Sequence, residues 1–225
     1  MATSTLEKFD LNNLPKNAIF FVIGKRATGK STLIKDLYNH YNPDISMVFS
    51  GGENSKLFYD EICKPKDIIR EKYNDNLVSD LIPATQEEAK KLRCLITENA
   101  VQESSQVKDA KFYKDIIYNS RSYNIIFING VQIGIALDDG LRSNIDYTFI
   151  AKTISASEID RLHKHYALPG MTRSEFSDIL AQATQERYTF LVIDHIKHKM
   201  YTYKVNVKEA SNGGFFSRIY RYLLG

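Results

Sequence analysis

Residues 18–41 read AIFFVIGKRATGKSTLIKDLYNHY, and this stretch decides the fold. The apolar run 18–23 has the β-branched and aromatic content of a buried strand. The next eight residues fit the pattern GxxxxGK[ST], and residues 31–41 have helical spacing. A phosphate-binding loop requires this order of strand, glycine loop and helix. Its glycines let backbone N–H groups curl around phosphate oxygens, and the helix N-terminus adds the positive end of its dipole. The stretch therefore predicts ATP or GTP binding.

Two side chains of this loop are expected to act directly on the phosphates. Lys30 would reach the β- and γ-phosphates, and the Ser31 hydroxyl would ligate Mg²⁺. The predicted nucleotide-binding residues are Gly24, Lys25, Arg26, Ala27, Thr28, Gly29, Lys30, Ser31 and Thr32.

The composition is that of one compact domain. The chain has 225 residues, 43% of them hydrophobic and 25% charged, which excludes a disordered tail protein, a fibre and a disulfide miniprotein. Its longest apolar runs, 18–23 and 190–193, are shorter than the roughly 20 residues that cross a bilayer. The N-terminus lacks a basic segment followed by an apolar one. We therefore expect no integral membrane segment, no secretion signal and an intracellular protein with reduced cysteines.

Short apolar runs alternate with helical segments along the whole chain. The expected strands are 18–23, 45–50, 93–97, 124–128, 146–151, 188–193 and 200–207. The expected helices are 31–41, 86–91, 111–119 and 157–166. Because parallel strands need long crossovers, this alternation predicts an α/β P-loop domain of the additional-strand type. Its mainly parallel central sheet would have about five strands flanked by helices, and the last two runs would form a C-terminal antiparallel hairpin. Residues 51–92 have no clean period and are expected to form an elaborated crossover.

A P-loop enzyme also needs an acidic residue at the end of a neighbouring strand to hold Mg²⁺. Three apolar runs end in an acid. The candidates are Glu98 in CLITEN, the pair Asp138 and Asp139 in IALDDG, and Asp194 in FLVID. Spacing alone favours the aspartate pair, although an Asp-Gly turn accounts for it equally well. A hairpin turn is the simpler interpretation of Asp194.

Four segments resemble one known family. They are VIGKRATGKSTLIKDL, MVFSGGENSKLFYDEI, the block RSYNIIFINGVQIGIALDDGLRSNIDYTFI at 121–150, and FLVIDHIKHKMYTYKV. Together they resemble the genome-packaging ATPases of large nucleocytoplasmic DNA viruses, poxvirus type, within the FtsK/HerA group of DNA-pumping motors. The block 121–150 carries the most specific likeness, with an RHYN-like lead, a strand that ends in a sensor glutamine, and an R-x-N-x-D context. The likeness extends from about residue 18 to 206.

The resemblance assigns roles to particular residues. In the family the acidic strand precedes the glutamine-bearing strand and a helix separates the two, which selects Glu98 as the metal-side acid beside Ser31. Gln132 would sense the γ-phosphate or orient water. Arg142 is the first candidate, and Arg121 the second, for an arginine that completes the site of a neighbouring subunit. Two departures from the family pattern are visible: Thr97-Glu98-Asn99 replaces two adjacent acids, and the turn Asp138-Asp139-Gly140 replaces the proline that the family has shortly before the arginine.

The resemblance further implies an ATP- and Mg²⁺-dependent translocase that packages double-stranded viral DNA into capsids. Its partners would be double-stranded DNA, further copies of the chain in an oligomeric ring, and capsid or portal proteins. It would be found in the host cytoplasm, at viral factories, or in the virion. The ATPase domain would span residues 1–207, and residues 208–225 would form a basic, amphipathic tail.

Two other functions stay open at the level of sequence. The P-loop and the chain length also fit a small-molecule kinase, although no arginine-bearing lid is evident. The single acid in Thr97-Glu98-Asn99 also fits a hydrolytically weak P-loop switch or a structural subunit.

Overall fold

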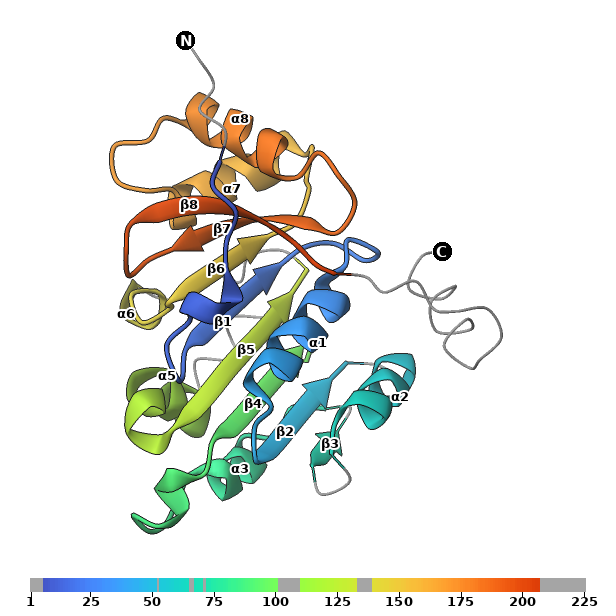
Figure 1. The fold of residues 1–225 in the computed structure, drawn as a ribbon, viewed down its shortest axis with the longest axis vertical. Coiled ribbons are helices and arrows are strands. Elements are labelled where there is room, and N and C mark those ends of the chain that lie inside the picture. The colour runs from blue at the N-terminus through green and yellow to red at the C-terminus, as the bar shows by residue number, and fades with distance from the viewer. Residues whose placement is uncertain are drawn as a thin grey trace.

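The computed structural model of the chain describes residues 6–51, 53–64, 67–70, 72–100, 110–132 and 139–206. Its centre is one eight-stranded sheet with the order β3-β2-β4-β5-β1-β6-β7-β8 (Figure 1). The strands are β1 (Ile19–Ile23), β2 (Ile45–Ser50), β3 (Ile68–Arg70), β4 (Arg93–Glu98), β5 (Ile125–Val131), β6 (Tyr147–Ile150), β7 (Thr189–Asp194) and β8 (Lys199–Lys204). All pairings from β3 to β6 are parallel, whereas β6–β7 and β7–β8 are antiparallel. The α/β prediction with a C-terminal hairpin is confirmed.

Helices cover both faces of the sheet (Figure 1). They are α1 (Lys30–Tyr41), α2 (Glu53–Ile62), α3 (Asp75–Val78), α5 (Lys111–Tyr123), α6 (Asp139–Arg142), α7 (Ala156–Tyr166) and α8 (Arg173–Ala183). Short 3₁₀ turns lie at Leu11–Asn13, Ser79–Leu81 and Glu88–Lys90. Side chains alternate across β1: Phe20 and Val22 belong to one hydrophobic cluster with residues of α1, whereas Ile19, Phe21 and Ile23 belong to another with residues of α5, α7 and α8. Burial on both faces explains why the strand runs are continuously apolar.

Local sequence signals explain where several helices begin and end. α1 ends at Asn42 and α5 at Asn124, and both asparagines adopt left-handed backbone angles, which asparagine tolerates better than most residues. α8 begins with a capping box, in which Thr172 and Glu175 satisfy each other's backbone N–H groups.

The structure differs from the prediction in one strand and in several helices. The parallel part has six strands rather than five, because residues 51–92 contribute α2 and the three-residue strand β3. The helix expected at 86–91 is wrong: only the 3₁₀ turn Glu88–Lys90 forms there. The helices α3, α6 and α8 were not expected. The predicted tail 208–225 lies outside the described residues, so the domain division stays a prediction.

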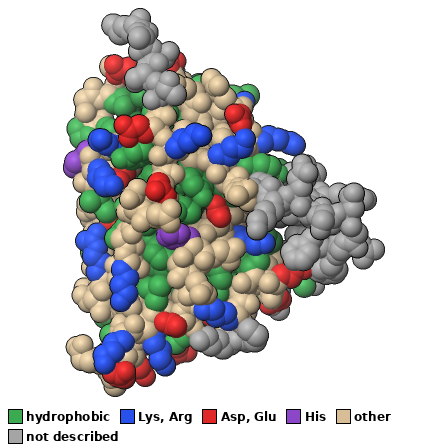
Figure 2. Space-filling view, viewed as in Figure 1, with side chains coloured by type: hydrophobic (Ala, Val, Ile, Leu, Met, Phe, Trp, Pro, Cys, Tyr) green, Lys and Arg blue, Asp and Glu red, His purple; other side chains and the backbone are tan. Residues whose placement is uncertain are grey.

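We call the margin of the sheet where strands β1 to β6 end the carboxyl edge, and the margin where they begin the amino edge. β7 runs in the opposite direction, so it starts at the carboxyl edge and ends at the amino edge. On the face seen in Figure 2, Lys and Arg side chains are interspersed with Asp and Glu side chains. No described helix is both long enough and apolar enough to span a bilayer.

Candidate nucleotide site

The predicted phosphate loop lies at the carboxyl edge, between β1 and α1. Its last residue before the helix, Gly29, has φ +92°, a backbone angle that glycine adopts without steric penalty. Gly24 is equally constrained, since a Cβ there would lie 2.6 Å from Thr28 Oγ1 and 2.7 Å from Ala151 Cβ. The Thr28 hydroxyl donates to the Lys25 carbonyl oxygen at 2.8 Å and closes the loop. The loop therefore has the shape that anion binding at a helix N-terminus requires.

Glu98 is the acid that meets this loop. The Ser31 hydroxyl donates to Glu98 Oε1 at 2.6 Å, and Lys30 Nζ lies 3.8 Å from the same oxygen. Lys30 is 5% exposed and Glu98 1% exposed. Burial lowers the pKa of the Lys30 ammonium group, and the nearby Glu98 carboxylate opposes this shift. Two chain segments, the start of α1 and the end of β4, thus bring a hydroxyl, an ammonium and a carboxylate close together.

Two residues that sequence reasoning missed hold Glu98 in place. Tyr59, on α2 and completely buried, donates its hydroxyl to Glu98 Oε2 at 2.7 Å. Gly130, on β5, is the register partner of Glu98, and a Cβ there would lie 3.3 Å from Glu98 Cγ and 2.8 Å from Ile34 Cδ1. The absent side chain at 130 lets Glu98 reach across β5 towards α1. A glycine inside an apolar strand is a visible signal for close approach, whereas nothing in the sequence marks Tyr59.

The geometry clarifies which place Glu98 takes in the Thr97-Glu98-Asn99 segment. The Thr97 hydroxyl points away from the loop and donates to Asn129 Oδ1 at 2.8 Å. Glu98 faces Ser31 and Lys30, and Asn99 follows with a left-handed φ of +53°. Asn99 thus directly follows the residue beside the loop, where the family pattern has its second acid.

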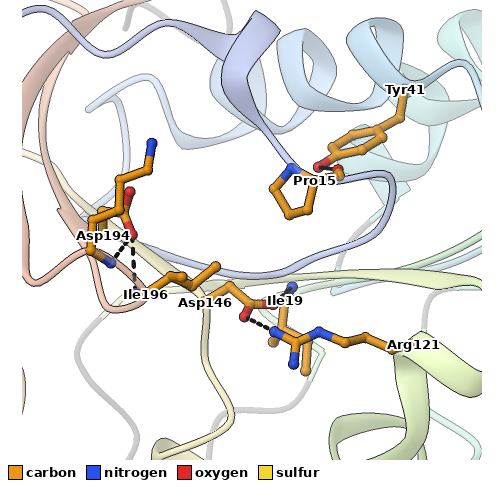
Figure 3. A network of polar contacts seen from close by, with 8 residues as sticks. Pro15, Ile19, Tyr41, Arg121, Asp146, Asp194 and Ile196 are labelled. Carbon is orange, nitrogen blue, oxygen red and sulfur yellow. Dashed lines mark hydrogen bonds and ion pairs between the residues drawn. The ribbon is translucent and has the colours of Figure 1, made fainter.

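The other acid candidates are Asp194 and the pair Asp138 and Asp139. Asp194 ends β7 at the amino edge, and its Oδ1 accepts the backbone N–H groups of Ile196 and Lys197 at 3.0 and 2.9 Å (Figure 3). The turn interpretation of Asp194 therefore fits, and this residue does not reach the phosphate loop. Asp138 lies outside the described residues, and Asp139 begins α6.

Gln132 directly follows β5 at the carboxyl edge. It lines an open pocket beside the start of the phosphate loop, together with Gly24 and Lys25 and with the segment that joins β6 to α7. On the rim, Lys25 Nζ pairs with Glu158 Oε1 at 2.9 Å. The structure thus brings Gln132 close to the loop, as the resemblance implies. Its role as a γ-phosphate sensor stays a prediction.

The two arginine candidates lie at the amino edge. Arg142 ends α6 and contacts His165 Nδ1 of α7. Arg121 Nη2 pairs with Asp146 Oδ1 at 2.6 Å, while Asp146 Oδ2 accepts the backbone N–H of Ile19 at 2.9 Å (Figure 3). Burial raises the pKa of Asp146, and these two donors oppose the rise. The first arginine and the last aspartate of the family-like block are therefore ion-pair partners.

Neither arginine reaches the phosphate loop of its own chain. β1 has five residues, which at about 3.3 Å per residue separates the two edges by roughly 16 Å. A role for Arg142 in catalysis therefore requires a second copy of the chain, as the prediction states.

Mg²⁺ fits the groups at this site. The ion prefers hard oxygen ligands from carboxylates, with phosphates and water completing its shell. The Ser31 hydroxyl and the Glu98 carboxylate are oxygen donors that already lie within 2.6 Å of each other at the N-terminus of α1.

Comparisons with known proteins show which solved structures share this fold. No protein-family model matches the chain. An uncharacterised protein of Invertebrate iridescent virus 6 is 26% identical over 180 residues, which cover 77% of this chain and 69% of that protein. The DNA-packaging ATPase of Sulfolobus turreted icosahedral virus superposes with a TM-score of 0.64 at 18% identity, over 84% of this chain and 98% of that one.

EssC of Geobacillus thermodenitrificans, in a structure of its ATPases 2 and 3, gives a TM-score of 0.59 at 12% identity, over 92% of this chain and 43% of that one. The resemblance found in the sequence is thus confirmed at the level of the fold. The chain shares its fold with a viral DNA-packaging ATPase and with EssC, and its sequence relatives are uncharacterised proteins of an iridescent virus and a mimivirus.

Proposed function

We propose that this chain is an Mg²⁺-dependent ATPase whose hydrolysis drives the packaging of double-stranded viral DNA, and that it works as an oligomeric ring. One observation carries the proposal: Lys30 and Ser31 at the start of α1 converge on the buried carboxylate of Glu98. The likeness of the fold to a viral DNA-packaging ATPase supports the coupling to DNA. In this reading capsid or portal proteins and DNA are the partners, at viral factories or in the virion.

The proposed chemistry assigns one task to each residue. The backbone N–H groups of the loop and the Lys30 ammonium would bind the β- and γ-phosphates. Ser31 and Glu98 would hold Mg²⁺, which when bound neutralises charge on the phosphate oxygens. Gln132, at the end of β5, would orient the attacking water from the pocket beside the loop. Arg142 would act on the nucleotide of a neighbouring copy, because it lies at the edge opposite its own loop.

The first test measures Mg²⁺-dependent ATP hydrolysis with and without double-stranded DNA. We expect DNA to stimulate turnover in the wild type, and Lys30→Ala, Glu98→Gln and Arg142→Ala each to abolish it. Arg173→Ala is the matched control, because Arg173 pairs with Asp160 on the surface and lies outside the site. Turnover that survives in Lys30→Ala would contradict the proposal.

A mixing experiment tests whether Arg142 acts in trans. Lys30→Ala subunits keep their arginine, and Arg142→Ala subunits keep their phosphate loop. Mixed rings should therefore regain activity at boundaries where the two intact groups meet. An arginine in this role contributes about 10³-fold or more to turnover. Mixtures that stay as inactive as the separate variants would argue against a shared site.

A second function is favoured by Asn99. Because this amide follows the metal-side carboxylate, nothing at position 99 can accept a proton from the attacking water. The alternative is a P-loop switch that binds nucleotide and hydrolyses it weakly. ATP binding with no turnover in the presence of DNA would favour the switch. Turnover that is lost in Lys30→Ala would exclude it.

A further inference from the structure

Tyr188 directly precedes β7 and packs against the phosphate loop. A Cβ on Gly29 would lie only 2.7 Å from Tyr188 Cδ1 and 3.4 Å from Cε1. The tyrosine comes from a segment more than 150 residues further along the chain, and it is half-buried. The ring of a partly exposed tyrosine therefore lies beside Gly29, the residue that directly precedes α1.

The backbone of Tyr188 is strained. Its φ is +61°, a left-handed angle that is a genuine outlier for a bulky residue. The Val205 N–H donates to the Tyr188 carbonyl oxygen at 3.0 Å, which holds the residue at the start of the β7–β8 pair. Strained residues of this kind persist where the surrounding structure overdetermines them, and they cluster at ligand sites.

The strand order gives the ring a position relative to the nucleotide. In the sequence β4-β5-β1-β6-β7, Glu98 ends β4 on one side of the phosphate loop, and Tyr188 starts β7 on the other. The terminal phosphate belongs on the Glu98 side, where Lys30 and Ser31 point. The nucleoside end of the same molecule must then extend away from Glu98, towards β6 and β7.

We propose that the Tyr188 ring stacks on the purine base of the bound nucleotide. This inference rests on the proposed function and adds the base-binding residue to it. An aromatic side chain contributes about 1–3 kcal/mol per stacked base, which corresponds to roughly tenfold to hundredfold in affinity. Stacking tolerates different bases, so Tyr188 contributes to ATP and GTP binding alike.

The first experiment compares ATP with inorganic triphosphate, which has no base. Binding of each in the presence of Mg²⁺ is measured by calorimetry for the wild type, Tyr188→Ala, Tyr188→Phe and the control Tyr118→Ala, whose residue is exposed on α5. We expect Tyr188→Ala to weaken ATP binding about tenfold to hundredfold and to leave triphosphate binding unchanged. Tyr188→Phe should bind ATP like the wild type.

Two results would overturn the inference. Equal weakening of ATP and triphosphate in Tyr188→Ala would mean that the ring only shapes the loop, and unchanged ATP binding would mean that the base lies elsewhere. If the wild type binds ATP no more tightly than triphosphate, the inference about Tyr188 is also contradicted, but the proposed phosphate site is not. A wild type that binds neither ligand would overturn the proposed function as well.

A spectroscopic experiment reports on the same contact without a loss of affinity. The chain contains no tryptophan, so Tyr188→Trp introduces a single tryptophan, whose emission can be excited separately from that of the tyrosines. Stacking of a purine should quench its emission when ATP binds, and triphosphate should not. Equal responses to ATP and triphosphate would contradict direct contact with the base.

Discussion

The hydrogen bond between Tyr59 and Glu98 can be measured as a free energy. Tyr59→Phe removes only the hydroxyl that donates to Glu98 Oε2 at 2.7 Å, and both residues are essentially inaccessible to solvent. A buried bond to a charged group contributes about 1.5–3 kcal/mol, and the carboxylate oxygen left behind has lost its donor. For a domain of this size each kcal/mol lowers Tm by about 2–4 °C. We therefore expect Tyr59→Phe to lower Tm by about 3–12 °C.

A double-mutant cycle assigns this loss to the pair. In the Glu98→Gln background the same change should cost only about 0.5–1.5 kcal/mol, because the acceptor is now neutral. Urea unfolding at pH 7 followed by circular dichroism gives the four free energies. Tyr118→Phe, at an exposed position on α5, is the control and should stay within about 0.5 kcal/mol of the wild type. Equal losses at Tyr59 in both backgrounds would refute the reasoning.

Three further outcomes are expected. Gly130→Ala should abolish Mg²⁺-dependent hydrolysis while the protein still folds, because the added methyl group displaces Glu98; thermal unfolding and an ATPase assay check both parts. Burial lowers the pKa of His195 from 6.5 to about 4. Between these two pH values the unfolded chain binds a proton on His195 that the folded chain does not bind, so the free energy of unfolding falls as the pH drops from 6.5 to about 4. His195→Asn should flatten that part of a Tm–pH curve. Arg121→Ala removes a group that holds down the raised pKa of Asp146, so its loss of stability relative to the wild type should be larger at pH 7 than at pH 4.

Most strands of the sheet could be predicted from patterns that lie within single short segments of the sequence. The apolar runs of β1, β2 and β4 and the helical spacing of α1 lie within single segments, and their predicted bounds agree with the structure within a residue or two. β3 has three residues, Ile68–Arg70, which is too few for any period to appear. α8 carried a readable start signal, the capping box at Thr172, which was overlooked.

In the candidate site, too, some residues could be predicted from local motifs, whereas others depend on tertiary packing. The phosphate loop is a local motif, and its flanks place it without any tertiary information. The acid at Glu98 required strand order, which the resemblance supplied and apolar spacing alone did not. Tyr59 and Tyr188 meet the site through crossovers and through the reversed strand β7, so their positions depend on tertiary packing that no short segment encodes.

The pairing of the first described residues with the last strand has a consequence for how the protein is made. Phe9 N–H donates to the Thr202 carbonyl oxygen at 2.8 Å, and Ile19 N–H donates to Asp146, 127 residues further along. During synthesis the segment from Phe9 to β1 leaves the ribosome long before either partner exists. Its apolar run stays unpaired until then, because contacts between residues so far apart in sequence form slowly. An exposed apolar run of this kind favours aggregation. The domain therefore completes its fold only after β8 has been translated.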